Sequence, residues 1–334
     1  MKKSYIKAIS YYLPTKVVTN EELVTEFPEW SVEMIASKIG IEERRVAAYD
    51  ETAVDLAVKA SEKLFAEYDN IHKDDVDFVV LCTQSPDYIL PTSACIIQHR
   101  LGLRTDIGAF DFNLGCSGYV YGLAIAKGLV VSGVASCVLL LTAETYNKHL
   151  HSRDKGNRTI FGDAATATII SDVGCAEIGE FVLGTNGEGA DNLIIRSGAS
   201  RCPEPMNDLT FDEGGNPCSS DFLYMNGAEI FSFTQQNVPV VVEKTLLKNN
   251  IEKSDVDLFV FHQANKYMLN FLRKKIKISE ERFFVNMAKV GNTVSNSIPI
   301  ALCDAKNKGL FKGNILLSGF GVGYSWGGVV LMVK

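Results

Sequence analysis

The chain has 334 residues and a mass of 36.6 kDa, enough to bury a large core in one or two domains. Hydrophobic residues make up 46% and charged residues 22%, which is typical of globular proteins, and the net charge of −7 argues against a nucleic-acid partner. No apolar run approaches the roughly 18–20 residues that a membrane-spanning helix needs. The N-terminal lysines have no apolar segment behind them that would make a signal peptide. We therefore expect a cytoplasmic protein that does not bind membranes.

The sequence contains eight cysteines, which without an export signal predict reduced thiols rather than a disulfide framework. There is no C-x-x-C pair, and the five histidines have no zinc-ligand spacing relative to the cysteines. We therefore predict no metal site.

Apolar, strand-like runs alternate along the chain with segments of helical pattern, which predicts the α/β class. The strands are nearly continuous in Val, Ile, Leu and Phe, so we expect sheets that are covered on both faces. The expected strands are 76–82, 138–142, 166–170, 258–262, 315–318 and 328–333. The expected helices are 52–67, 92–101, 117–131, 226–249, 266–276 and 295–308.

An internal repeat divides the chain. Residues 71–80 (IHKDDVDFVV) can be laid on residues 251–260 (IEKSDVDLFV), with six of the ten positions identical. The repeat indicates two similar α/β halves, 1–175 and 176–334, although chance similarity between two amphipathic segments is an alternative. A duplicated fold places its active site between the halves, so functional residues are expected from both.

Cys116 lies where an apolar strand-like segment passes through Gly115 into a helix that is rich in small residues. Unpaired backbone N–H groups and the positive end of the helix dipole favour the thiolate there, the form that attacks a carbonyl carbon. Because free cysteines are often inert core residues, this position alone does not establish catalysis.

Two polar residues of the second half stand at comparable places. His262 ends a strand in FVFHQAN (259–265), at an edge where α/β proteins place groups that handle ligands. Asn292 lies in the turn VGNT (290–293) before a helix. Taken singly, a surface histidine and a turn with a helix cap explain both residues.

Together, strand–Gly–Cys–helix, FHQAN and GNT resemble the β-ketoacyl-acyl-carrier-protein synthase III family of the thiolase superfamily, and the resemblance covers nearly the whole chain. Three further segments match that family's motifs: GIEERRV at 40–46, FGDAATA at 161–167 and GFGVGYSWG at 319–327. The resemblance implies a thiolase-like fold of two duplicated α/β halves in a five-layered αβαβα arrangement.

The resemblance also implies a mechanism, in which Cys116 takes the acyl group from an acyl-CoA. His262 and Asn292 donate hydrogen bonds to the thioester oxygen of malonyl-acyl carrier protein as decarboxylation creates an enolate there. The backbone N–H groups of Cys116 and Val322 form the oxyanion hole, and Phe320 walls the acyl pocket. This chemistry needs no cofactor.

Two positions depart from the family. Val322 replaces a common glycine, and a positive φ at this β-branched residue is expected to be costly. Leu90 stands where many members have phenylalanine, at the position that reaches across the family's homodimer into the partner's acyl pocket, so we expect a reshaped pocket.

The CoA and carrier residues are expected at the mouth of the tunnel. Lys38 replaces an arginine there and keeps only a point charge, and Trp30 lies further upstream than in the family. Arg158 is a candidate phosphate contact, and Asn265 is expected to support His262. A basic helix face with Lys266, Arg273 and Lys274 is expected to attract the acidic carrier, although Tyr267 stands at a position where an arginine often contacts it.

Other functions remain open at this level. One alternative is a synthase III-like paralogue of specialised metabolism, with a longer or unusual acyl donor or a non-malonyl acceptor, which the departures and the Gly-rich stretch 184–220 favour. A non-catalytic binding protein of the same fold is a second, and retention of Cys116, His262 and Asn292 argues against it. A cysteine peptidase would not explain the internal repeat.

Overall fold

The computed structural model describes residues 2–334, in which helices and strands alternate as expected. Up to residue 171 the elements are β1 Tyr5–Tyr12, β2 Lys16–Thr19, α1 Asn20–Glu26, α2 Val32–Ile39, β3 Glu43–Val46, α3 Ala53–Glu67, β4 Phe78–Cys82, α4 Ser93–Leu101, β5 Gly108–Phe112, α5 Gly118–Ser132, β6 Cys137–Glu144, α6 Lys155–Arg158 and β7 Ala164–Ser171. From residue 176 they are β8 Ala176–Ile178, β9 Val182–Thr185, β10 Leu193–Ile194, β11 Thr210–Phe211, β12 Pro217–Cys218, β13 Tyr224–Met225, α7 Gly227–Asn249, β14 Leu258–Phe261, α8 Lys266–Ile276, α9 Ser297–Asn307, β15 Gly313–Gly321 and β16 Ser325–Val333.

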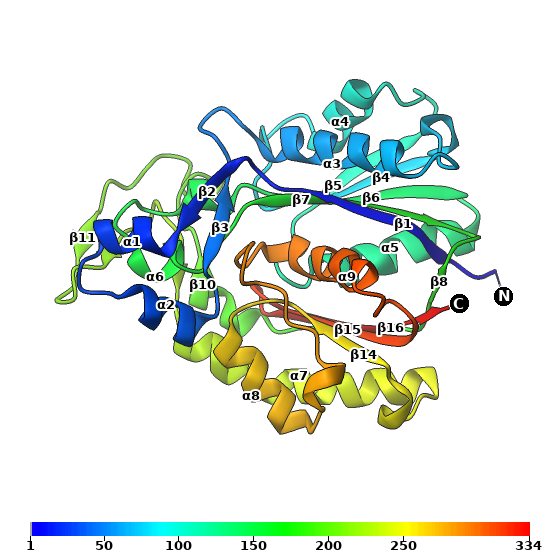
Figure 1. The fold of residues 1–334 in the computed structure, drawn as a ribbon. Helices are drawn as coiled ribbons and strands as arrows, with labels where there is room; N and C mark the ends of the chain where they lie inside the picture. Colours follow the sequence, from blue (N-terminus) through cyan, green and yellow to red (C-terminus); the bar gives the residue numbers. More distant parts are fainter. Residues whose placement is uncertain (1) are drawn as a thin grey trace.

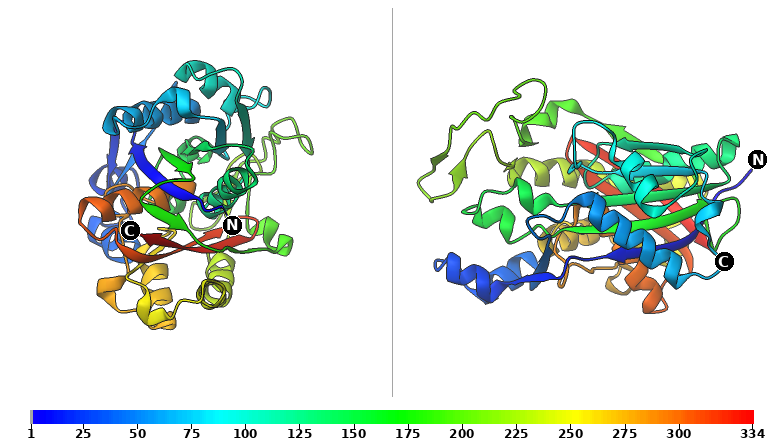
Figure 2. Two further views of the ribbon diagram at one scale, coloured as in Figure 1. Left: turned by 90° about the vertical axis from the view of Figure 1, so that its right-hand side faces the viewer. Right: turned by 90° about the horizontal axis from the view of Figure 1, so that it is seen from above.

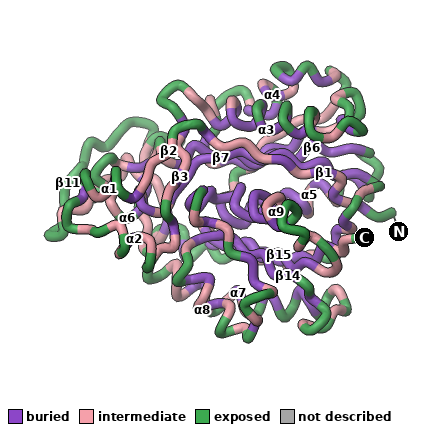
Figure 3. Tube along the Cα trace, viewed as in Figure 1, coloured by how far each residue is buried: buried purple, intermediate pink, exposed green. Residues whose placement is uncertain are grey.

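The elements stack in five layers (Figure 1). Helices α3 and α4 cover one sheet, helices α5 and α9 lie between the two sheet layers, and α7 and α8 cover the other sheet. The buried residues follow the strands and the two central helices (Figure 3). The predicted α/β class with a five-layered αβαβα arrangement is confirmed.

The two sheet layers are continuous along one edge. Their strand order is β14-β15-β16-β8-β1-β7-β6-β4-β5, with β9 also pairing with β16. The short strand β8 pairs with β1 on one side and with β16 on the other, and so joins the two layers. Its first residue, Ala176, is also the first of the predicted second half. No helix within residues 2–334 is long and apolar enough to cross a membrane.

The internal repeat corresponds to one structural unit that occurs in both layers. In each copy a short 3-10 helix, Lys73–Asp75 or Lys253–Asp255, leads into a strand that pairs in parallel with a later strand, β4 with β6 and β14 with β15. The matching aspartates do the same work: Asp77 accepts the N–H groups of Ser136 and Cys137, and Asp257 accepts that of Asn314. These six identical positions therefore start equivalent strands.

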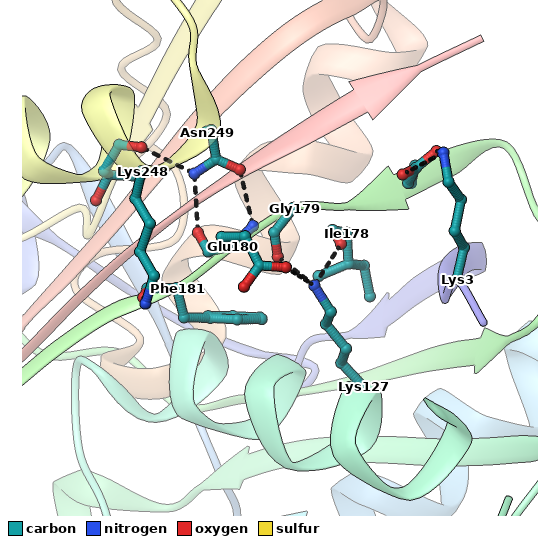
Figure 4. Close-up of polar contacts among 10 residues, drawn as sticks. Lys3, Lys127, Ile178, Gly179, Glu180, Phe181, Lys248 and Asn249 are labelled. Carbon is teal, nitrogen blue, oxygen red and sulfur yellow. Dashed lines mark hydrogen bonds and ion pairs between the residues drawn. The ribbon is translucent and has the colours of Figure 1, made fainter. Parts of the chain in front are cut away.

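A polar cluster fixes the segment that passes from one layer to the other (Figure 4). Lys127 of α5 donates to the carbonyls of Ile178 and Gly179 and to the carboxylate of Glu180, at 2.8–3.1 Å. Asn249, the last residue of α7, accepts the N–H of Glu180 and donates to its carbonyl. The central and outer helices thus hold the crossing segment from both sides.

Candidate active site

Cys116 lies in the turn that leads from β5 into α5, two residues before the helix begins, as the sequence predicts. Its side chain is buried. The turn lies against strand β15 at Gly321, which has no side chain. A Cβ on Gly321 would lie 2.8 Å from Cys116 Cβ and 3.1 Å from Cys116 Sγ. A Cβ on Gly319 would lie 2.8 Å from Ser117 Cα. The glycines of β15 therefore let a strand of the second half pack directly on the cysteine turn.

His262 follows β14 and is also buried. Its Nδ1 lies 2.7 Å from Ser297 Oγ, and its backbone N–H donates to the carbonyl of Ser318 on β15. Because Ser297 occupies Nδ1, Nε2 is the ring nitrogen left for the site. The hydroxyl of Ser297 can accept from Nδ1 or donate to it, so it supports either neutral tautomer of the ring.

Asn292 is held by hydrogen bonds on its backbone and on its side-chain oxygen. Its N–H donates to the carbonyl of Ile160, its carbonyl accepts the N–H of Gly162, and its Oδ1 accepts the N–H of Val294 at 2.9 Å. With Oδ1 engaged, the amide Nδ2 is available as a donor. Val294 has φ +56°, a left-handed conformation that costs a β-branched residue about 1–3 kcal/mol. Val322, where a positive φ was expected to be costly, is not among the residues with positive φ.

These three side chains line one cavity of about 160 Å³, to which Phe320 and Gly321 also contribute. The Phe320 ring stands edge-on to the imidazole, with the centroids 5.5 Å apart. The remaining walls are mainly apolar and come from Tyr146, Phe161, Leu193, Met225, Ile230 and Met268. The structure therefore brings residues from both halves of the chain to one largely apolar site.

Burial controls the protonation of the polar groups. It raises the pKa of the Cys116 thiol to about 12, and the nearby Glu144 carboxyl adds to the rise. It lowers the pKa of His262 to about 3, against a smaller opposing contribution from a hydrogen bond with the Val294 backbone. At neutral pH the site thus holds a thiol and a neutral imidazole. The helix end alone does not produce the thiolate that the sequence suggested, because desolvation outweighs it.

Two backbone donors remain at the cysteine turn. Among the described residues, the N–H groups of Cys116 and Val322 have no backbone or side-chain acceptor. Ser325 Oγ connects their turns, donating to the Val322 carbonyl at 2.8 Å and lying 2.6 Å from Ser117 Oγ. Two N–H groups on linked turns are suited to hold an oxyanion, the role predicted for them.

A second, wider hollow of about 760 Å³ lies between α2 and α8 and shares Asn265 with the cavity. We call it the lysine hollow, because Lys38, Lys266 and Lys274 line it together with Ser37, Ile39, Tyr267, Asn270 and Phe271. Four of the residues predicted to bind CoA or the carrier, Lys38, Asn265, Lys266 and Lys274, thus line one hollow beside the site.

Other residues predicted for that role lie elsewhere. Arg158 forms a bidentate ion pair with Glu26 of α1 and also donates to the carbonyl of Ser152. Arg273 turns toward the end of its own helix, 3.6 Å from Glu280. Trp30 lines neither the cavity nor the lysine hollow.

Asn265 was predicted to support His262, but the structure gives that role to Ser297. Asn265 caps α8, where its Oδ1 accepts the N–H of Met268 at 2.8 Å, and Ser297 holds the histidine instead. Ser297 lies in the polar run that follows Asn292, so the sequence marked it as a candidate. Its contact with His262 could not be predicted, because the two residues lie far apart in the sequence.

Glu144 is a second residue that the sequence reasoning missed. It ends the buried strand β6, and its carboxylate accepts hydrogen bonds from the Gln84 N–H and from the hydroxyls of Ser85 and Ser295. Burial raises its pKa to about 8. Glu144 could have been recognised in the sequence as a single acidic residue at the end of an otherwise apolar strand.

Leu90 lies outside the cavity of its own chain, on a loop where three consecutive apolar side chains face solvent: Tyr88 is 62%, Ile89 89% and Leu90 83% exposed.

A thiol, a neutral imidazole and an amide in one cavity of a five-layered fold define an acyl-transferring enzyme of the thiolase-like class. Models of 3-oxoacyl-[acyl-carrier-protein] synthase III and of its C-terminal part match residues 110–187 and 246–333. A curated β-ketoacyl-[acyl-carrier-protein] synthase III of Clostridium perfringens is 36% identical over 99% of both chains, and one of Fusobacterium nucleatum is 37% identical over 98% of this chain and 97% of its own. A solved 3-oxoacyl-(acyl-carrier-protein) synthase III is 49% identical over 99% of each chain, with a TM-score of 0.96.

The chain belongs to the β-ketoacyl-acyl-carrier-protein synthase III family, and it is an acyl-condensing transferase.

Proposed function

We propose that the chain condenses an acyl-CoA primer with malonyl-acyl carrier protein, with loss of CO₂, and so initiates fatty-acid synthesis. The observation that carries this proposal is the cavity in which Cys116 of one half meets His262 and Asn292 of the other, within a chain whose curated relatives bear the synthase III name. The names of these relatives do not favour a paralogue of specialised metabolism or a non-catalytic binding protein.

In the first half-reaction Cys116 Sγ attacks the thioester carbon of the acyl-CoA. Because burial raises the pKa of this thiol to about 12, a proton acceptor is needed, and neutral His262 supplies Nε2. The new S–C bond forms as the bond to the CoA sulfur breaks, and the proton on the imidazole passes to the departing CoA thiolate. The N–H groups of Cys116 and Val322 hold the oxyanion of the tetrahedral intermediate.

In the second half-reaction the malonyl C–CO₂ bond breaks, and its electron pair forms an enolate on the thioester. For this step His262 is in the neutral tautomer that carries its proton on Nε2, with Nδ1 accepting from the Ser297 hydroxyl. Nε2–H of His262 and Nδ2–H of Asn292 then donate to the developing enolate oxygen. The enolate carbon attacks the acyl-Cys116 carbonyl, the S–C bond breaks, and the Cys116 thiolate regains a proton from solvent. The largely apolar walls favour decarboxylation, since they stabilise a neutral CO₂ better than a carboxylate.

The proposal includes a cytoplasmic homodimer whose Leu90 reaches the partner's acyl pocket. The exposure of Tyr88, Ile89 and Leu90 supports it, because three adjacent apolar side chains are costly to leave in water. Light scattering after size-exclusion chromatography tests the assembly, and a stable monomer at micromolar concentration would contradict it.

The reaction is tested by incubating the protein with a panel of acyl-CoAs and reading acylation of Cys116 by intact mass, before malonyl-acyl carrier protein is added. Loading of acetyl or short branched acyl groups, followed by release of a β-ketoacyl product, supports the initiating role. Loading of only long or aromatic acyl groups would favour the specialised alternative. No loading of any member would refute the proposal.

A further inference from the structure

The motif GIEERRV at 40–46 contains a fully buried arginine that takes no part in either half-reaction. Arg44 lies on β3 and donates only to uncharged oxygens. Its Nη1 donates to the Val18 carbonyl at 3.2 Å, and its Nη2 donates to Asn20 Oδ1 at 2.9 Å and to the Thr159 carbonyl at 2.8 Å. Burial lowers the pKa of this guanidinium to about 10, so it is a cation at neutral pH. Because burying a cation beside uncharged acceptors costs free energy, the arginine is better explained by what it holds in place than by stability.

The Thr159 carbonyl belongs to the segment that holds Asn292. It is part of the peptide unit that leads into Ile160, whose own carbonyl accepts the Asn292 N–H at 2.8 Å. Two residues further, the Gly162 N–H donates to the Asn292 carbonyl at 3.0 Å, and the two hydrogen bonds make an isolated parallel bridge. The guanidinium of Arg44 is therefore one residue away from the carbonyl that fixes the Asn292 backbone.

The aliphatic stem of Arg44 lies in a space that two glycines leave beside this bridge. A Cβ on Gly291, which has φ +73°, would lie 3.2 Å from Arg44 Cβ. A Cβ on Gly162 would lie 3.5 Å from Arg44 Cβ and would overlap the Val290 carbonyl oxygen. One side chain thus lies against both segments of the bridge, the one that carries Asn292 and the one that holds it.

We infer that Arg44 is a positioning residue for the second half-reaction: it fixes segment 159–162, and through it the direction in which the Asn292 amide meets the enolate oxygen. Arg44 is not among the residues that line the cavity, whereas Ile160 and Asn292 are, so it acts through them rather than on substrate. This inference rests on the proposed function, because it concerns the hydrogen bond to the enolate of that reaction. Acylation of Cys116 does not use the Asn292 amide and is therefore expected to be independent of Arg44.

Arg44→Met tests this inference, because it keeps an apolar stem and removes the guanidinium donors. Formation of the acetyl-Cys116 enzyme is timed by intact mass, and the acyl-enzyme is then mixed with malonyl-acyl carrier protein for a single turnover. We expect that turnover to slow about tenfold to a hundredfold, since displacement of a catalytic group by about 1 Å costs about a hundredfold. Acylation of Cys116, and the carrier concentration that half-saturates the turnover, are expected to stay within about twofold of the wild type.

A double-mutant cycle shows whether Arg44 acts through Asn292. Asn292→Ala removes the positioned amide, so Arg44→Met is expected to slow the turnover of that variant by less than about twofold. An arginine with a purely structural role would give losses that multiply, because each substitution would then act on the site independently.

Two further variants complete the design. Arg45→Met is the matched control: Arg45 is the next residue of β3, is half-buried and does not line the cavity, so neither rate is expected to change. Arg44→Lys keeps the cation and one donor group, and its turnover is expected to lie between those of the wild type and Arg44→Met. If Arg44→Met does not fold, Arg44→Lys carries the same measurements and the same cycle.

The outcomes separate this inference from the proposed function. Equal slowing of acylation and turnover in Arg44→Met, losses that multiply in the cycle, or an unchanged turnover would each refute the role of Arg44 and leave the proposed function standing. The same selective loss in Arg45→Met would also overturn it, as would failure of both Arg44 variants to fold, which would make the residue structural. If the wild-type acyl-enzyme gives no β-ketoacyl product, the proposed function itself fails.

Discussion

The two halves of the molecule use equivalent elements for different chemistry. At the start of α5 the first half places Cys116, and at the start of α9 the second half places Ser297, which holds His262. The last residue of β4 in the first half is the buried Cys82, which donates to the Leu114 carbonyl, whereas the matching position in the second half, directly after β14, is His262. One repeated unit therefore supplies the nucleophile, and the other supplies a neutral imidazole that serves both steps and an amide that donates a hydrogen bond in the second.

The difference shows how a duplicated fold divides a two-step reaction. The first half needs a strong nucleophile in a dry site, which explains a buried thiol beside a helix end. The second half needs donors that stay uncharged, and burial keeps His262 neutral across the physiological range. Changes in either half are expected to separate the two steps.

The largest effect is expected from Cys116→Ala, which removes the group that carries the acyl chain. Acylation and condensation are expected to fall by a thousandfold or more, on the order of the loss seen when a covalent nucleophile is deleted. Steady-state condensation and intact mass are the measurements. Cys137→Ala, at another buried cysteine, is the control. Comparable losses in both variants would mean that Cys116 is not the nucleophile of the first half.

Asn292→Ala is expected to affect one step only. Without its amide donor the enolate loses part of its stabilisation, and decarboxylation is expected to slow by about 10²–10³-fold. Acylation of Cys116 depends on the first half and on His262, so intact mass is expected to show normal loading. An equal loss of loading would mean that the two halves do not divide the reaction.

Gly321→Ala tests the contact between the halves. The added Cβ would lie 2.8 Å from Cys116 Cβ, so the turn or the strand must shift. We expect a loss of about 1–3 kcal/mol in the free energy of unfolding and up to about a hundredfold slower acylation. Thermal unfolding and loading rates are measured against Gly128→Ala in α5, where a Cβ meets nothing within 4 Å and helix propensity predicts a gain of about 0.5–1 kcal/mol. A stable, active Gly321→Ala variant would contradict the close packing.

The smallest effect concerns pH. Alkylation of Cys116 by iodoacetamide is expected to quicken about tenfold per pH unit below the thiol pKa of about 12. Glu144, with a pKa of about 8, is largely neutral at pH 7 and negative at pH 9, where its charge opposes thiolate formation. Glu144→Gln is therefore expected to raise the alkylation rate about twofold to fivefold at pH 9 and to leave it unchanged at pH 6.5. Equal rates at pH 9 would mean that the carboxyl does not act on the thiol.

Local sequence predicted the main elements closely. The apolar periodicity of residues 266–276 gave the bounds of α8, and the continuous apolar strands gave the sheet layers. Strand β1 was missed, because its buried residues, Ile6, Ala8 and Ser10, alternate with partly exposed tyrosine, lysine and isoleucine. Helices α1 and α2 were missed as well, since they are short and carry only a few buried residues.

The site was predictable where a residue's role follows from its own segment. Cys116, His262 and Asn292 each stand at the end of an element, and the motifs around them identified them. Contacts between distant segments were not predictable: Arg158 meets Glu26 across 132 positions, and Ser297 meets His262 across 35. The direction of the shift in the Cys116 pKa was predicted wrongly for a related reason. A helix end can be recognised from a few residues, whereas the burial that raises this pKa depends on the whole fold.

The position of β8 has a consequence for the connectivity of the chain. At the same end of the molecule the Lys334 N–H donates to the Cys175 carbonyl, and the Cys175 N–H donates to the Ile6 carbonyl, so both termini meet at the crossing between the halves (Figure 2). A short linker from Lys334 to the N-terminal residues would close the backbone into a ring. New ends opened in the exposed hairpin of β11 and β12 would leave every strand of the large sheet intact. The geometry therefore does not dictate which half is synthesised first, and a circular permutant is expected to build the same cavity.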